Sequence, residues 1–198
     1  MKSVICCAHA GGQGKTTVSQ LLQVVSAEVG SPLKVVAADF IDESGRSKIG
    51  RMYSGDVEEL GTGPDVELAR VKNDLNASLK YWDRLGGLLL RGGFVFDMGA
   101  NVIDQVLDWG KARHASELMR SRSAPQVEVV LVCRAEKRAI DDMADLVARF
   151  GSLEALPISR ISVCKNEIAG SFDALDLESI LRRIPINCEL NFFDLPRC

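Results

Sequence analysis

The fold of this chain is decided by residues 9–17, which read His-Ala-Gly-Gly-Gln-Gly-Lys-Thr-Thr. An apolar run precedes this stretch at 4–8, and a helical pattern follows it at 18–29. Glycines allow backbone N–H groups to converge on an anion, and the first turn of the following helix adds partial positive charge. A strand, a glycine loop, a Lys-Thr pair and a helix in this order predict a phosphate-binding loop.

The loop matches seven of the eight positions of the pattern G-x-x-x-x-G-K-[ST], and the mismatch is His9 at the first glycine. Lys15 is predicted to reach the β- and γ-phosphates of a nucleotide, and the Thr16 hydroxyl to ligate Mg²⁺. The alternative is a glycine-rich turn that carries a lysine without binding phosphate. The strand before the loop and the helix after it favour phosphate binding. His9 either contacts the nucleotide or an opposing protomer, or is tolerated because glycine is not sterically required there.

The chain has 198 residues, of which 46% are hydrophobic and 26% are charged. This composition is typical of a globular protein, and no linker or repeat divides it, so we expect one nucleotide-binding domain over residues 1–198. A net charge of −3 provides no general attraction to nucleic acid or to anionic membranes. DNA binding therefore needs a local basic patch. Arg113, Arg120 and Arg122 are candidates for it, although a solvated helix face is the commoner explanation.

The cysteine pattern favours reduced thiols. Six cysteines are present, and those in apolar, strand-like runs are Cys6, Cys7, Cys133 and Cys164. No C-x-x-C pair occurs, and the two histidines lack metal-ligand spacing. The chain begins without a signal peptide, and no apolar run approaches the ~18 residues that a bilayer span needs. We therefore expect a soluble cytoplasmic protein with no membrane role.

The helix predicted at 18–29 has apolar residues at the spacing i, i+3, i+4 and i+7, which predicts one buried face. The residues on this face are Val18, Leu21, Leu22, Val25 and Val29. Gly30 and Pro32 end the helix.

The rest of the chain alternates between strand and helix patterns. Strands are predicted at 33–38, 94–96, 127–133, 158–164 and 186–190. Further helices are predicted at 65–85, where Gly86-Gly87 interrupts the pattern, and at 103–119, 135–150 and 175–184. Strands that are apolar throughout and alternate with helices imply a parallel sheet covered on both faces. The predicted fold class is α/β, with a single-domain, doubly wound, mostly parallel sheet of the P-loop NTPase type.

Ligands in such folds bind at the carboxyl ends of the strands, so we expect the loops that begin at Ala8, Asp39, Asp97 and Lys165 to meet. Asp97 ends an apolar strand, where its carboxylate can hold Mg²⁺ directly or through water. The alternative for Asp97 is a helix N-cap or a turn residue. Asp39 is the second carboxylate candidate, with a turn in a charged loop as its alternative. Gly99 offers a backbone N–H that can sense a γ-phosphate.

These residues resemble the ParA/MinD-type ATPases, whose phosphate loop reads K-G-G-x-G-K-T-T. The matching positions are residues 11–17, Asp39 at a strand end, and the segment Phe-Val-Phe-Asp-Met-Gly-Ala at 94–100. Residues 96–101 are similar to the D-x-G-A segment of small plasmid-borne members, the conjugal-transfer TraL and plasmid-stability StbB-like proteins.

The resemblance implies an ATP-dependent homodimer with Mg-ATP between its protomers. It also implies action in plasmid or DNA partition, plasmid stability or conjugal transfer, with a partition or transfer protein as partner. Mg²⁺ is assigned to Thr16 and Asp97. The residues assigned to nucleotide binding are Gly11, Gly12, Gln13, Gly14, Lys15, Thr16, Thr17, Gly99, Lys165 and Asn166, of which the last two are expected near the adenine.

Two positions depart from the family pattern. The signature lysine that reaches the partner's ATP falls at Ala10, and the second aspartate of the D-x-D segment falls at Ile41. Asp42 lies one residue further and is the candidate to orient the attacking water, with Lys15 and Asp39 completing the catalytic set. A cation acting across the interface is worth roughly 10³–10⁵ in rate when it is an arginine finger. We therefore expect a weak, slow ATPase.

Two other functions fit the residues. One is a P-loop enzyme that uses ATP to phosphorylate or ligate a small molecule, with Arg46 and Lys48 as candidate substrate contacts. The other is a nucleotide-binding regulator without turnover.

Overall fold

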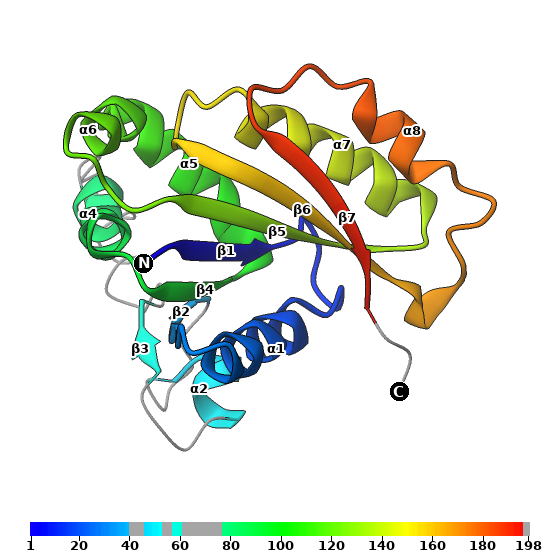
Figure 1. Cartoon of the computed structure of the whole chain (residues 1–198), viewed down its shortest axis with the longest axis horizontal. Helices are drawn as coiled ribbons and strands as arrows, with labels where there is room; N and C mark the ends of the chain where they lie inside the picture. The colour runs from blue at the N-terminus through cyan, green and yellow to red at the C-terminus, as the bar shows by residue number, and fades with distance from the viewer. Residues whose placement is uncertain (40–45, 53–56, 61–76, 196–198) are drawn as a thin grey trace.

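The computed structural model describes residues 1–39, 46–52, 57–60 and 77–195. In this part of the chain, seven strands form an all-parallel sheet in the order β3-β2-β4-β1-β5-β6-β7 (Figure 1). The strands are β1 (Ser3–Cys7), β2 (Lys34–Ala38), β3 (Glu58–Glu59), β4 (Phe94–Met98), β5 (Val127–Arg134), β6 (Ile158–Asn166) and β7 (Glu189–Asp194). The predicted fold class is confirmed, and β1, which leads into the glycine loop, lies at the centre of the sheet.

Helices pack on both faces of this sheet (Figure 1). One face carries α1 (Lys15–Glu28) and α2 (Lys48–Met52). The other carries α4 (Ala77–Arg91), α5 (Ile103–Ala112), α6 (Ala115–Ser121), α7 (Lys137–Gly151) and α8 (Leu177–Arg182). Short 3₁₀ turns, η1 (Ala100–Val102) and η2 (Glu167–Ala169), follow β4 and β6. None of the helices in the described ranges is long and apolar enough to cross a membrane.

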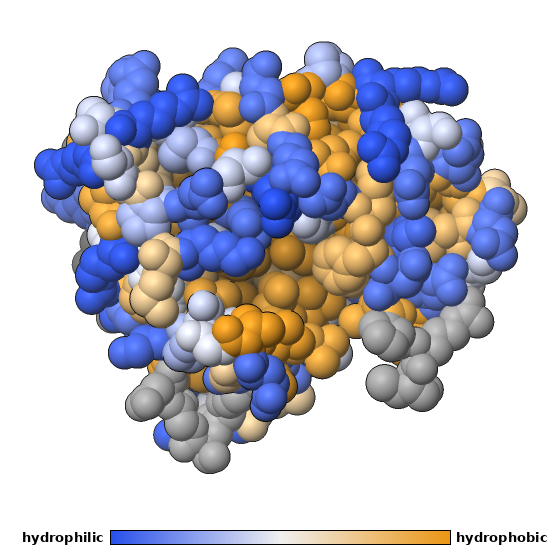
Figure 2. All heavy atoms as spheres, in the orientation of Figure 1, coloured by the Kyte–Doolittle hydropathy of each residue, from blue (hydrophilic) through white to orange (hydrophobic). Residues whose placement is uncertain are grey.

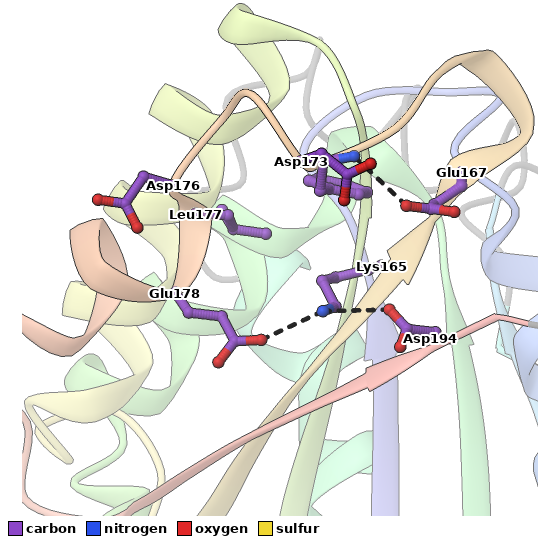
Figure 3. Close-up of a pocket in the computed structure, with 8 residues that line it drawn as sticks. Lys165, Glu167, Asp173, Asp176, Leu177, Glu178 and Asp194 are labelled. Carbon is purple, nitrogen blue, oxygen red and sulfur yellow. Dashed lines mark hydrogen bonds and ion pairs between the residues drawn. The ribbon is translucent and has the colours of Figure 1, made fainter.

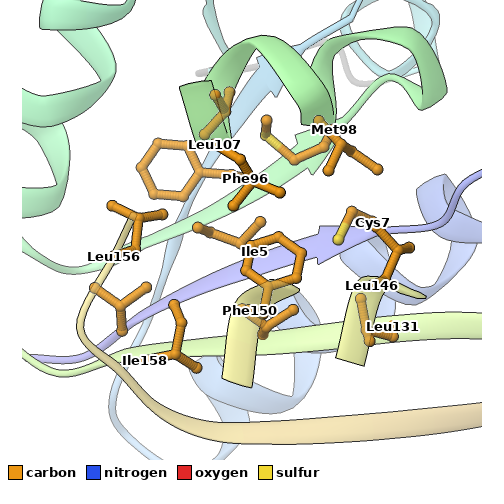
Figure 4. Packing of buried hydrophobic residues seen from close by; sticks show 14 of the residues in the cluster. Ile5, Cys7, Phe96, Met98, Leu107, Leu131, Leu146, Phe150, Leu156 and Ile158 are labelled. Carbon is orange, nitrogen blue, oxygen red and sulfur yellow. The ribbon is translucent and has the colours of Figure 1, made fainter. Parts of the chain in front are cut away.

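The core divides into two layers because successive residues of a strand face opposite sides of the sheet. On β5, Val129 and Leu131 face α4–α8, whereas Val130 faces α1. Figure 4 shows the larger layer, in which Phe96 of β4 and Phe150 of α7 pack against the central strands. The apolar strands therefore have the two-sided burial that their sequence predicts. The four cysteines predicted to be buried in strands are buried and unpaired.

The prediction that one face of α1 is buried is wrong for most of the helix. Val18 is buried, but Leu21, Val25 and Val29 are 44%, 56% and 70% exposed. None of the described helices packs beside α1 on β5, β6 and β7. The side of α1 that faces those strands is therefore not covered by another helix. The periodicity is real, but it does not show whether another element covers the face.

A hollow of about 420 Å³ lies between α1 and these open strands. Its apolar lining includes Val4, Leu22, Val25, Leu33, Val130 and Phe193. Figure 2 shows apolar side chains gathered on this face of the molecule. The chain therefore exposes apolar surface that a doubly wound sheet normally buries.

The prediction that Gly86-Gly87 interrupts a helix is also wrong, because α4 continues through both glycines to Arg91. A Cβ on Gly86 would lie 2.7 Å from Trp109 Cζ2, so this glycine lets the Trp109 ring pack directly against the α4 backbone. Such packing outweighs the helix cost of a glycine, about 1 kcal/mol. The predicted beginning of this helix, 65–76, lies outside the described residues.

Other predicted elements also differ in their boundaries. The helix predicted at 103–119 is two helices, because His114 between α5 and α6 has a φ of 50°. The last strand, predicted near 186–190, is β7, which begins at Glu189 and continues to Asp194. β6 continues two residues beyond the predicted end and takes in Lys165 and Asn166. Each difference depends on contacts between elements, which local periodicity does not contain.

Candidate functional site

The glycine loop lies at the edge of the sheet where the strands end, between β1 and α1. The parallel register places Cys6 of β1 and Ala37 of β2 on either side of Asp97 of β4. These two small side chains leave space for α1, which packs on β4 and β1. The start of α1 and the end of β4 are thereby brought together, as the sequence predicts.

Glycine is required at position 14 for two reasons. The φ of Gly14 is +97°, a left-handed conformation that side chains disfavour. A Cβ there would also lie 2.8 Å from Asn166 Nδ2. Gly14 ends the loop, and its carbonyl accepts the first helical hydrogen bond of α1 from Val18 N at 3.0 Å.

Gln13 and Asn166 fasten the loop to the ends of β5 and β6. The buried Gln13 side chain accepts a hydrogen bond at its Oε1 from Arg134 N at 3.0 Å. The Gln13 carbonyl accepts from Asn166 Nδ2 at 2.9 Å, and Asn166 Oδ1 accepts from Ile168 N at 3.1 Å. Both side chains, predicted to bind nucleotide, thus hold the loop in its conformation.

The other loop residues lie around the start of α1. Lys15 Nζ donates to the Ala10 carbonyl at 3.1 Å, so its ammonium group lies against the loop. Gly11, Gly12 and Thr17 are exposed at the same edge of the sheet. Backbone N–H groups and a lysine gathered at a helix N-terminus form an anion site.

Asp97 is held by two hydroxyl groups of α1. Thr16 Oγ1 donates to Asp97 Oδ2 at 2.9 Å, and Ser19 Oγ donates to Asp97 Oδ1 at 3.0 Å. Asp97 is only 3% exposed, and this burial raises its pKa above the usual aspartate value, although both hydrogen bonds oppose the shift. Asp97 thus joins the loop helix to the neighbouring strand rather than capping a helix.

Sequence reasoning missed Ser19. Its hydroxyl is fully buried and contacts the carboxylate predicted to hold magnesium. The signal available was helical spacing, because Ser19 follows Thr16 by three residues and therefore lies on the same face of α1. A single serine in a helical pattern carries no other mark of function.

Asp39 and Gly99 meet where β2 and β4 end. Gly99 N donates to the Ala38 carbonyl at 2.8 Å, and a Cβ on Gly99 would lie 3.2 Å from Asp39 Cα. The negative charge of Asp39 helps to raise the pKa of Asp97. The structure thus brings the two predicted carboxylates together. A γ-phosphate contact by the Gly99 N–H requires its bond to Ala38 to open. Asp42, the predicted water-orienting residue, lies outside the described residues.

Lys165 is not brought to the loop. Adjacent strand residues face opposite sides of a sheet, so Asn166 faces the loop and Lys165 faces α8. Lys165 Nζ is 3.1 Å from both Glu178 Oε1 and Asp194 Oδ1 (Figure 3), and the hydrogen bond to Asp194 is the main cause of its raised pKa. This ion pair lies in a hollow of about 590 Å³ whose other carboxylates include Asp173 and Asp176.

Two further side chains border the loop. His9 Nδ1 lies 3.8 Å from Asp142 Oδ2 of α7, so the residue that breaks the motif faces α7. Arg134 Nε is buried without a hydrogen-bond partner, and its Nη2 is 3.4 Å from Glu136 Oε1. Arg134 therefore brings a cation to the end of β5, where its backbone N–H also bonds to Gln13.

The residues at this edge fit a magnesium ion that is shared with a nucleotide. Thr16 and Asp97 present adjacent hard oxygen donors, which Mg²⁺ prefers. Within the described ranges, no group of three or more His, Cys, Asp or Glu side chains can hold a metal. Magnesium commonly takes one or two protein ligands together with phosphate oxygens and water, and this donor set matches that arrangement.

No family model and no curated protein matches the sequence. Solved structures do match. The structure of a protein assigned provisionally to plasmid partition, from Borrelia burgdorferi B31 and bound to AMPPNP, is 15% identical with a TM-score of 0.53. The match covers 98% of this chain and 87% of that one. The fold is P-loop NTPase-like.

Cobyrinic acid a,c-diamide synthase from Mycobacterium smegmatis, with bound ADP and magnesium, is 13% identical with a TM-score of 0.55. This match covers 94% of this chain and 83% of the synthase. An ATP complex of McdA from Cyanothece matches with 13% identity over 98% of this chain and 82% of McdA, with a TM-score of 0.47. The similarity to the first two of these proteins, with TM-scores above 0.5, is a similarity of fold. At these identities it defines the fold alone.

Proposed function

We propose that this chain is an ATP-dependent switch of the ParA/MinD type, which binds Mg-ATP at residues 11–17 and hydrolyses it slowly. The observation that carries the proposal is the 2.9 Å hydrogen bond between Thr16 Oγ1 and Asp97 Oδ2. This contact joins the end of the phosphate loop to the carboxylate at the end of β4. Those are the two groups that a P-loop ATPase uses to hold nucleotide-bound magnesium.

Each group has a chemical task in this proposal. The loop N–H groups and Lys15 bind the phosphates, while Thr16 and Asp97 hold Mg²⁺. The ion supplies positive charge that neutralises the charge developing on the phosphates. Asp39, beside Asp97, and Asp42 are the candidates to position the attacking water.

Slow hydrolysis is expected because position 10 carries alanine instead of a cationic side chain. Ala10 contributes a carbonyl that accepts from Lys15, and its methyl group supplies no cation to an opposing protomer. The proposed output is therefore the nucleotide-bound state, a homodimer that binds a partition or transfer protein. Such a switch acts in plasmid or DNA partition, plasmid stability or conjugal transfer.

Light scattering with and without Mg-ATP tests this function, with Lys15→Ala as the site variant and Lys111→Ala as the control. Lys111 lies on α5 and pairs with Glu154. We expect Mg-ATP to convert the wild type and the control from monomer to dimer, and to leave Lys15→Ala monomeric. An unchanged monomer that releases phosphate only with a small-molecule substrate indicates an enzyme instead. Turnover of about 1 s⁻¹ without a partner, within the ordinary enzyme range, contradicts a slow switch.

A further inference from the structure

Ser19 and Thr16 together hold both oxygens of Asp97. Ser19 Oγ donates to Oδ1 at 3.0 Å, and Thr16 Oγ1 donates to Oδ2 at 2.9 Å. The two hydroxyls come from positions three apart on α1, so they lie on one helix face. Ser19 is 0% exposed, and its hydroxyl is therefore out of reach of solvent.

The local packing explains why Ser19 bonds to Asp97. A serine inside a helix commonly donates to the carbonyl one turn earlier, which here belongs to Lys15. That carbonyl instead accepts a weak hydrogen bond from Cys6 Sγ at 3.5 Å. Because Cys6 lies opposite Asp97 in the β1–β4 pairing, Ser19 lies over this strand pair and its hydroxyl meets the carboxylate.

The two hydroxyls have different tasks once magnesium is considered. The Thr16 oxygen must offer a lone pair to the metal, and a hydroxyl can do this while it donates its hydrogen. Ser19 has no metal to ligate, and its hydroxyl contacts protein groups, the Asp97 carboxylate and the Cys6 thiol. Without Ser19, the carboxylate is held at one oxygen only and can rotate about its terminal bond. With Ser19, Oδ1 stays turned toward the helix and Oδ2 stays beside Thr16.

We propose that Ser19 is a positioning residue for the magnesium of the bound nucleotide. It acts through Asp97 and does not touch the nucleotide itself. This inference rests on the proposed function, because it assumes that Thr16 and Asp97 hold Mg²⁺. The phosphates are bound by residues 11–17 independently of Ser19. Its removal should therefore weaken the magnesium-dependent part of ATP binding and spare the rest.

Titration calorimetry of Ser19→Ala, with ATP in excess Mg²⁺ and in EDTA, measures the magnesium-dependent gain in affinity. We expect this gain to fall about 10- to 100-fold relative to the wild type, the usual effect of losing a group that orients a metal-binding residue. Affinity in EDTA should not change. Ser19→Thr keeps the hydroxyl and should restore the gain, whereas a purely structural role predicts equal losses in both buffers.

Ser26→Ala is the matched control. Ser26 is also a buried serine of α1, but its hydroxyl donates to the Gln23 carbonyl at 2.7 Å and accepts from Leu33 N at 3.0 Å. Its loss should lower the thermal unfolding temperature and leave the magnesium-dependent gain at the wild-type value. An equal loss of gain in Ser26→Ala and Ser19→Ala overturns the role of Ser19.

The remaining outcomes of these titrations also support or overturn the proposal. Ser19→Ala with the full wild-type gain overturns the positioning role and leaves the proposed function standing. A wild-type chain that binds no ATP in either buffer overturns the proposed function and the role of Ser19 with it. If Ser19→Ala does not fold, Ser19→Cys serves in its place, because cysteine has a similar shape and is a weaker hydrogen-bond donor. A reduced gain in Ser19→Cys supports the role, and an undiminished one rejects it.

Discussion

Gly14 is the residue on which the shape of the loop depends most directly. Its φ of +97° and its closeness to Asn166 exclude a side chain for independent reasons. Gly12 shares the first constraint, with a φ of +73°, but a Cβ there meets nothing within 4 Å. A side chain at position 12 would therefore meet backbone strain alone, whereas one at position 14 would meet both backbone strain and a steric clash.

We expect Gly14→Ala to destabilise the protein by about 2–4 kcal/mol, because it adds a displaced Asn166 amide to backbone strain. Gly12→Ala should cost only about 1–2 kcal/mol, the strain of the left-handed conformation alone. Urea unfolding of the two variants without nucleotide measures both free energies. Equal losses would show that the Asn166 amide moves away freely, contrary to its role in holding the loop.

At the scale of elements, α4 shows how packing overrides a local signal. Gly86 faces the Trp109 ring of α5, whereas Gly87, its neighbour, is exposed with no atom within 4 Å of an added Cβ. The same dipeptide thus contains one glycine required by packing and one that only weakens the helix.

Alanine substitutions in α4 should have opposite effects. Gly87→Ala should stabilise the protein by up to about 1 kcal/mol, because alanine is the better helix former. Gly86→Ala should destabilise it by about 1–3 kcal/mol, because its methyl group forces the Trp109 ring out of place. Thermal unfolding followed by tryptophan fluorescence measures both changes. Stabilisation by Gly86→Ala would mean that α4 and α5 are not packed as described.

For the molecule as a whole, the main difference from a parallel sheet covered on both faces is the exposed side of α1 and the uncovered face of β5, β6 and β7 beside it. The exposed large apolar residues that line the hollow on this face are Met1, Val25, Val29 and Phe193. Apolar side chains that gather in one region, rather than scatter singly, mark a surface with affinity for apolar molecules.

We expect the folded protein to bind an apolar reporter dye such as ANS at this hollow. Val25→Gln should reduce the dye fluorescence while changing the free energy of unfolding by no more than about 0.5 kcal/mol, as is usual at exposed positions. Ile180→Gln, at an exposed position of α8, is the control and should leave the signal unchanged. A native chain that binds no dye, or equal losses in both variants, would contradict this expectation.

The sequence by itself determined the features that depend on neighbours along the chain. The glycine loop, Lys15 and Thr16 form one local pattern, and Asp97 lies near the end of an apolar strand, so their meeting could be inferred from parallel topology. Only the tertiary structure decided the pairing of Ser19 with Asp97, the turn of Lys165 away from the loop and the exposure of Val25. These depend on strand register and on which faces other elements cover. Both arise from contacts between residues far apart in the chain, which local periodicity does not encode.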